Sequence, residues 1–178
     1  MIKDEKNMKK VRLTLQRGAM AVVTCVLLSL MSCATSGMTR EEKAAERARV
    51  AQAVEDSVMN MTFTVEVNYV NPQRMPSRML NYGYSVKVDG DYLDSYLPFF
   101  GRVYRAEFGE QTGLHFKERI AERKVVKAKR DCYAVELVVR RRLEILIYRF
   151  DVFNNGKVSL MVTSDNRDSM LFSGELAL

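Results

Sequence analysis

Residues 61–69 read "MTFTVEVNY", and they decide the fold because apolar and polar side chains alternate along them one by one. A period of two is that of a β-strand, whose successive side chains point to opposite faces of a sheet. The stretch therefore predicts a strand with one apolar and one polar face. The residues expected on the apolar face are Met61, Phe63, Val65, Val67 and Tyr69, and those on the polar face are Thr62, Thr64, Glu66 and Asn68.

Before this strand the period is that of a helix. Thr39 and Glu42 form a capping box, T-x-x-E, ahead of the charged segment "KAAERARVAQAVEDSVM". Small apolar residues recur along it every three or four positions, so we predict a helix over residues 39–60 that packs on its own domain. A partner-binding helix and a loosely attached stalk are the alternatives. The apolar stripe consists of Ala44, Ala48, Ala51, Val54 and Val58.

The rest of the chain repeats the strand pattern. Alternation over Leu80–Val88 ends at Asp89–Gly90, a hairpin signal, and Asn155–Gly156 joins two later strands. Nearly every link is short, which favours antiparallel neighbours. The predicted fold class is α+β: one curved antiparallel β-sheet over residues 61–178, a meander or a partial barrel, with the amino-terminal helix packed on it. The later strands are predicted at 92–97, 102–108, 114–118, 132–139, 145–153, 157–164 and 169–176.

Residues 1–32 are predicted to be a lipoprotein signal peptide. Residues 1–18 are basic, and the apolar run over 19–31 is too short to cross the roughly 30 Å hydrocarbon core as a stable helix. "LMSC", which ends at Cys33, resembles a bacterial lipobox, where a thiol accepts diacylglycerol and a small residue before it admits the signal peptidase. Two or three acyl chains on Cys33 would anchor the protein to a membrane, with residues 33–38 as a tether.

This segment also predicts a location, the cell envelope. No acidic cluster follows Cys33, so we expect the outer membrane with the protein facing the periplasm, and surface exposure is the alternative. An ordinary signal peptide cleaved near Ala34 is the alternative to lipidation. Translation starts at Met1 or at Met8.

The charge of the chain argues against a nucleic-acid partner. Six of the 28 Lys and Arg residues and two of the 22 Asp and Glu residues precede Cys33, which reduces the net charge from +6 to +2 for the remainder. The basicity thus belongs mostly to the leader, and neither a basic helix nor an arginine-plus-aromatic RNA-binding signature remains.

The sequence predicts no metal site, no cofactor and no catalytic residues. Its single histidine, His115, has only the distant Cys132 as a soft companion ligand. Nucleophile-elbow, P-loop and dinucleotide-binding patterns are absent. The chain is therefore expected not to be an enzyme. The alternative is an envelope hydrolase that uses carboxylates such as Asp89, Asp91 or Glu136.

Two clusters are candidate binding features. The first, "YLPFFGRVY" over residues 96–104, gathers four aromatic residues around a proline and a glycine, and a corner of the core is the plainer interpretation. The second, the arginines over 140–142, lies between two strands, where a solvated turn is expected and contact with lipid headgroups or a glycan is the alternative. The candidate binding residues of the first cluster are Tyr96, Phe99, Phe100, Arg102 and Tyr104.

With "YLPFFGR" and the ending "NGKVSLMVTSDNRDSMLFSGEL", the chain resembles a domain-of-unknown-function family of small β-rich lipoproteins and secreted proteins from Gram-negative gut anaerobes. The resemblance spans roughly residues 58–178. It implies an antiparallel sheet with a helix, and it supplies no catalytic residues. Because Asn166 and Arg167 belong to this ending, they are added to the candidate binding residues. Phe99 and Phe172 stand where the family pattern leads us to expect tyrosine.

Taken together, the sequence predicts a cell-envelope lipoprotein that acts as a non-catalytic binding or interaction module. Its partners would be the membrane, through the lipid on Cys33, and a protein, peptide or lipid ligand. Besides the hydrolase, a structural component of an outer-membrane assembly is a further alternative.

Overall fold

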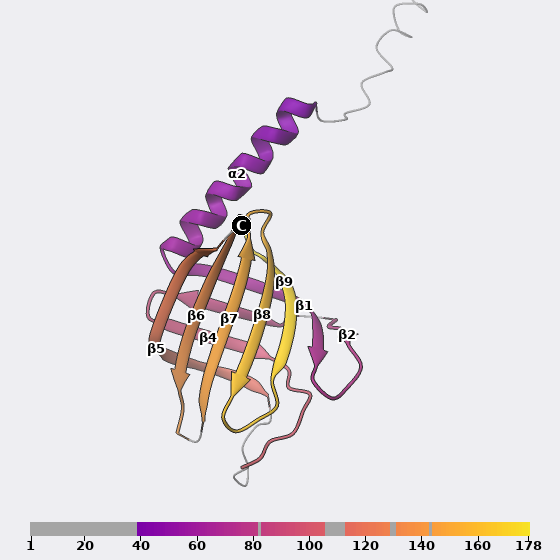
Figure 1. Ribbon diagram of the computed structural model, residues 1–178, viewed down its shortest axis with the longest axis vertical. Coiled ribbons are helices and arrows are strands. Elements are labelled where there is room, and N and C mark those ends of the chain that lie inside the picture. The colour runs from indigo at the N-terminus through magenta and orange to yellow at the C-terminus, as the bar shows by residue number, and fades with distance from the viewer. Residues whose placement is uncertain (1–38, 82, 106–112, 129–130, 143) are drawn as a thin grey trace, which may run out of the picture. The chain divides into compact units, whose positions relative to one another are not determined.

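The computed structural model describes residues 39–81, 83–105, 113–128, 131–142 and 144–178, which form an α+β domain (Figure 1). The predicted signal peptide, the tether, Cys33 and Tyr82 lie outside the described residues. Among the described residues, no helix is long and apolar enough to span a membrane.

The predicted helix is α2 (Arg40–Met59), and only its second half packs on the sheet. Val54 and Val58 are fully buried in the core, whereas Ala44 and Ala48 are exposed. The predicted stripe was therefore wrong over its first half. An alanine methyl group buries little apolar area, while each valine buries enough to gain roughly 1.5 kcal/mol or more. Figure 1 shows the start of α2 projecting beyond the sheet.

Within the described residues, nine antiparallel strands follow the helix and eight of them close into a barrel, which confirms the predicted antiparallel sheet. The order is β2-β1-β3-β4-β5-β6-β7-β8-β9, and an additional pairing of β1 with β9 closes the ring, with β2 outside it. The strands are β1 (Thr62–Pro72), β2 (Arg78–Met79), β3 (Ser85–Asp89), β4 (Tyr92–Leu97), β5 (Leu114–Ala128), β6 (Cys132–Arg140), β7 (Ile145–Phe153), β8 (Lys157–Ser164) and β9 (Met170–Leu176).

Two long strands form the corners of the barrel. The first part of β5, 114–119, pairs with β4, and the part over 120–128 pairs with β6, with an irregularity in register between Ile120 and Glu122. Strand β1 likewise pairs with β3 over 62–66 and with β9 over 65–72. Because a bulge bends a strand, β1 and β5 each belong to two layers. Figure 1 shows β5–β9 crossing in front of β3 and β4.

The β1 bulge corrects one sequence prediction. Val67 pairs with Gly174 and Tyr69 pairs with Ser173, so Asn68 is the extra residue. One extra residue reverses the side-chain alternation, and Tyr69 is 39% exposed instead of facing the core.

Two predicted strands also differ from the structure. The strand predicted at 114–118 continues to Ala128. The prediction ended too early because both faces of β5 are largely exposed after the bulge, so apolar and polar residues no longer alternate there. The strand predicted at 102–108 is wrong for the residues described there, since Val103 alone bridges to Arg167. The hairpins at Asp89–Gly90 and Asn155–Gly156 are confirmed, with positive φ at both glycines (59° and 80°).

The barrel interior is filled with side chains from both layers. Phe63 of β1 meets Phe150 of β7 edge to face, with ring centroids 5.5 Å apart, and Phe116 of β5 meets Tyr148 in the same way at 6.3 Å. Tyr148, Phe150 and Phe172 are among the largest fully buried residues. The sheet is thus a packed core, as expected of a small barrel.

Candidate functional site

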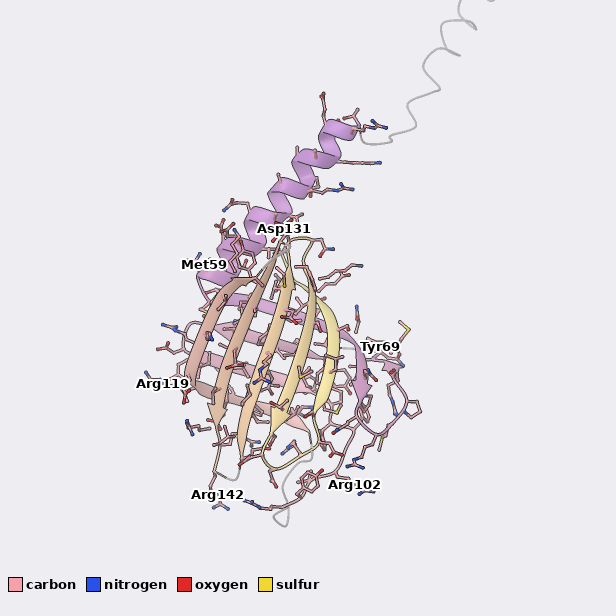
Figure 2. The ribbon with its side chains drawn as sticks, in the orientation of Figure 1. Met59, Tyr69, Arg102, Arg119, Asp131 and Arg142 are labelled. Carbon is pink, nitrogen blue, oxygen red and sulfur yellow. The ribbon has the colours of Figure 1, made fainter. Side chains whose placement is uncertain are left out.

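The family-like motifs meet at the end of the barrel far from α2, where Figure 2 shows Arg102 and Arg142. Here the segment after β4 runs beside the segment that joins β8 to β9. We call this group the end cluster. Its members are Phe99, Gly101, Arg102, Tyr104, Arg105, Arg141, Glu144, Ser164, Asp165, Asn166, Arg167 and Asp168.

The two segments are joined by backbone hydrogen bonds. The amide of Asp168 donates to the carbonyl oxygen of Arg102 at 3.0 Å, and the amide of Tyr104 donates to that of Asn166 at 2.9 Å. The side chain of Asn166 extends this pairing, because its Nδ2 donates to the Arg105 carbonyl (2.8 Å) while its Oδ1 accepts from the Arg105 amide (2.7 Å). An asparagine amide carries both a donor and an acceptor, so here it makes the two hydrogen bonds that the backbone of a neighbouring strand would make.

The carboxylate of Asp168 also binds the segment after β4. Its Oδ2 accepts from the Arg102 amide at 3.0 Å, its Oδ1 accepts from the Tyr104 hydroxyl at 2.7 Å, and Arg74 Nε lies 3.3 Å from Oδ2. The hydrogen bond from Tyr104, followed by that from the Arg102 amide, lowers the pKa of Asp168. The neighbouring Gly101 leaves no room for a side chain, since a Cβ there would lie 3.0 Å from the Asp168 Cβ.

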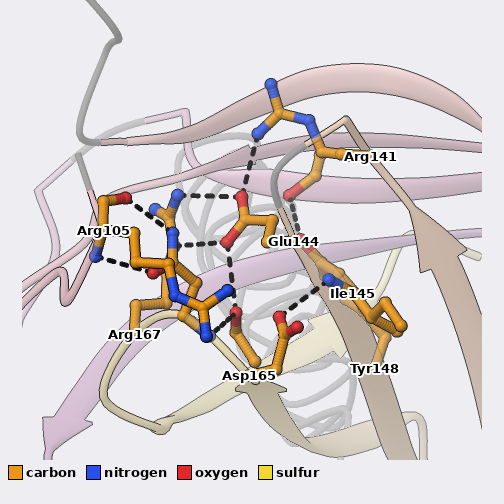
Figure 3. Close-up of polar contacts among 10 residues, drawn as sticks. Arg105, Arg141, Glu144, Ile145, Tyr148, Asp165 and Arg167 are labelled. Carbon is orange, nitrogen blue, oxygen red and sulfur yellow. Dashed lines mark hydrogen bonds and ion pairs between the residues drawn. The ribbon is translucent and has the colours of Figure 1, made fainter. Parts of the chain in front are cut away.

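A buried ion pair lies at the centre of the end cluster (Figure 3). Arg167 donates two hydrogen bonds to the carboxylate of Glu144, from Nε to Oε2 at 2.7 Å and from Nη2 to Oε1 at 2.8 Å. Arg141 Nη1 and the Ser164 hydroxyl add further donors, each at 3.1 Å. Glu144 is 4% and Arg167 6% exposed. Such a bidentate pair is strong, and it is costly to break because the remaining charge would stay buried without this counter-ion.

Aromatic rings pack against the arginines and join the cluster to the core. The guanidinium of Arg167 lies 5.1 Å from the ring centroid of Phe99, and that of Arg141 lies 4.7 Å from Phe116. Beneath them the Tyr148 hydroxyl donates to Ser95 Oγ at 2.9 Å. Burial raises the pKa of Tyr148, so this phenol stays protonated and serves as a donor.

Five of the seven candidate binding residues lie in the end cluster: Phe99, Arg102, Tyr104, Asn166 and Arg167. Phe100 lies beside it, with the Arg78 guanidinium 4.5 Å from its ring centroid. Tyr96 lies apart, on the outer face of the sheet, where its ring stacks on His115 at 4.3 Å. The binding role of these residues stays a prediction.

Sequence reasoning missed Glu144 and Asp168 and treated Arg141 as part of a solvated turn. The turn prediction was wrong for Arg141, whose side chain is only 24% exposed. The available signal was a lone glutamate between apolar residues in "RRRLEIL", since a carboxylate buried in a turn needs a cation. Its partner Arg167 is 23 residues away in the sequence, and spacing alone does not connect them.

The end cluster is built to hold loops together. Its buried polar groups bond to one another, and among the described residues the buried side-chain atom without a hydrogen-bond partner is Asn154 Oδ1, outside the cluster. No group of three His, Cys, Asp or Glu residues suited to a metal ion occurs in the described part of the chain. The geometry therefore supports a structural role for the motif.

The closed antiparallel sheet, the helix on one end and the ion-pair cluster at the other define a class of small α+β barrel domains. The sequence of residues 41–176 matches the profile of the domain of unknown function DUF4251. Because the match covers most of the chain, the chain belongs to the DUF4251 family, which confirms the resemblance drawn from the motifs.

A solved structure agrees with the fold. The crystal structure of a DUF4251 family protein from Bacteroides eggerthii superposes with a TM-score of 0.57 at 13% sequence identity, covering 74% of this chain and 89% of that chain. At this identity the likeness concerns the fold alone. A search of curated proteins found no match.

Proposed function

We propose that this protein is a cell-envelope lipoprotein that acts as a non-catalytic interaction module. The observation that carries the proposal is the lipobox "LMSC" ending at Cys33, placed after a basic stretch and a short apolar run. Acyl chains on Cys33 would hold the barrel at a membrane, on the periplasmic side of the outer membrane, with the cell surface as the alternative.

A hydrolase is the less favoured alternative, because its candidate carboxylates each lie beside a cation. Glu136 Oε2 lies 2.6 Å from Arg149 Nε, and Asp91 Oδ1 lies 3.3 Å from Arg123 Nη1. Asp89 Oδ2 lies 3.6 Å from Lys87 Nζ. These pairs are exposed to solvent, whereas the carboxyl group of a general acid is typically shielded from it.

A structural component of an outer-membrane assembly is the third possibility. Crosslinking in intact cells separates it from an interaction module. A stable stoichiometric complex would favour the structural role, and transient or ligand-dependent crosslinks would favour the module.

Fatty-acid labelling of cells tests the anchor. We expect the wild-type chain to incorporate labelled palmitate and Cys33→Ala to lose the label. Cys25→Ala is the matched control, because Cys25 lies in the apolar run before the lipobox and should leave labelling unchanged. Label that persists in Cys33→Ala would contradict the proposal.

A further inference from the structure

A pocket of about 440 Å³ opens on the outer side of β1, where the neighbour of β1 changes from β3 to β2. Two backbone hydrogen bonds fix its walls: the Val67 amide donates to the Tyr84 carbonyl at 2.8 Å, and the Leu80 amide donates to the Asn68 carbonyl at 2.9 Å. Its volume is within the range of roughly 300–1,000 Å³ typical of small-molecule sites. Polar side chains in the lining include Thr64, Glu66, Asn68, Asn81, Ser85 and Glu175.

An aromatic stack begins at the pocket and continues away from it over β4 and β5. Tyr84 lines the pocket and stacks on Tyr96 at a centroid distance of 5.7 Å, and Tyr96 stacks in turn on His115 at 4.3 Å. Tyr96 and His115 are cross-strand partners on the outer face, and Tyr96 is 49% exposed. The stack therefore holds the ring of Tyr84 at the pocket wall.

Two carboxylates stand side by side in the same wall. Glu66 of β1 is directly opposite Glu175 of β9, and within the described residues neither of them forms an ion pair. Lys157 is opposite Glu175 on its other side, also without an ion pair to it. Like charges directly opposite each other destabilise a strand pair, so the pairing of Glu66 with Glu175 is by itself unfavourable.

We propose that this pocket binds a neutral saccharide. The C–H groups of a sugar ring pack on the negative face of an aromatic ring, and Tyr84 is the aromatic residue of the described lining. Sugar hydroxyls donate to carboxylates in charge-assisted hydrogen bonds, and the amides of Asn68 and Asn81 offer both donors and acceptors. Glu66 and Glu175, which form no ion pair with any described residue, repel phosphate and uronate groups. The inference deepens the proposed function, on which it rests, by naming a ligand class for the interaction module.

Titration of the full-length chain with oligosaccharides tests the pocket. The chain is kept in a detergent without sugar headgroups, and the probes are cellotetraose, maltotetraose, mannotetraose and chitotetraose, with trigalacturonate and tetralysine for comparison. We expect at least one neutral probe to bind by isothermal titration calorimetry and trigalacturonate not to bind.

Variants locate the binding. We expect Tyr84→Ala and Glu66→Gln each to weaken binding about tenfold or more, which corresponds to the roughly 1.4 kcal/mol of one charge-assisted hydrogen bond or ring contact. Tyr92→Ala is the matched control, since Tyr92 is a 50% exposed tyrosine of the same outer face but does not line the pocket. Because Tyr84 is half-buried, the exposed Glu66 provides a variant that leaves the core intact.

Three outcomes would overturn the inference: no neutral probe binds, binding survives both pocket variants, or tetralysine alone binds and does so through Glu66 and Glu175. Fatty-acid labelling of Cys33 is independent of all three. A failed pocket and a failed anchor are therefore distinguishable.

Discussion

At the scale of single residues, Gly174 shows how closely β9 approaches β1. A Cβ at this position would lie only 2.1 Å from the Glu66 carbonyl oxygen, a backbone atom that cannot rotate away. We expect Gly174→Ala to lower the free energy of unfolding by about 2 kcal/mol or more, because one strand must move. Thermal denaturation followed by circular dichroism measures this, with Ser173→Ala on the exposed face as the control. Equal melting temperatures for both variants would contradict the close approach.

A glutamate-to-glutamine substitution should have a large effect on stability in the buried ion pair and a small effect in an exposed one. Glu144→Gln leaves the Arg167 cation buried without its carboxylate, and we expect a loss of about 3–5 kcal/mol in the free energy of unfolding. Glu136→Gln removes the exposed partner of Arg149, and we expect a loss of about 1 kcal/mol or less. Urea denaturation compares them. Similar losses in the two variants would show that the Glu144 pair is not buried in solution.

Asp168 predicts how stability depends on pH. Its pKa is lowered in the folded state, chiefly by the Tyr104 hydroxyl, so folding favours the ionised form. This contribution is present above the unfolded-state pKa and is lost as the pH falls through the folded-state pKa. We expect Tyr104→Phe to raise the pKa of Asp168 and to reduce the loss of stability in acid. Urea midpoints measured between neutral and strongly acidic pH test this, and parallel curves for wild type and variant would argue against it.

At the scale of elements, α2 should contribute stability through its second half only. Val54 and Val58 lie in the core, and Lys127 of β5 ties the helix to the sheet by an ion pair with Glu55 at 3.4 Å. We expect Val54→Ala to cost about 1–3 kcal/mol, since it removes buried methyl groups and leaves a cavity. Ala44→Ser, on the exposed half, is the control and should cost at most about 0.5 kcal/mol. Equal costs, measured by urea denaturation, would mean that the whole helix packs.

Elements with a local signal could be predicted from the sequence, and elements fixed by distant contacts could not. The helix, the glycine hairpins and the strands over 92–97, 145–153 and 157–164 follow from periodicity and turn residues. The corner in β5 depends on which neighbour each half pairs with, and Tyr69 faces outward because of a bulge opposite β9. The same limit applies to the end cluster, since Glu144 and Arg167 meet only once β7 and the segment after β8 are in place.

At the scale of the whole molecule, the ends of the barrel differ from its outer face in how their charged groups are paired. The end cluster uses its buried polar groups to close one end of the barrel, and α2 covers the other end with two valines. On the outer face of β1, by contrast, Glu66 and Glu175 form no ion pair within the described residues, and the aromatic stack begins beside them. Like charges in such positions do not stabilise a sheet, so the outer face is where we expect the proposed interaction module to meet its ligand.

The central claim, that the protein acts from a membrane through a lipid on Cys33, is tested most directly by mass spectrometry of the mature chain isolated from its native cells. The account predicts that the first residue is Cys33, with diacylglycerol on its sulfur and a further acyl chain on its amino group. An unmodified amino terminus, or a chain that still begins at its start methionine, would contradict it.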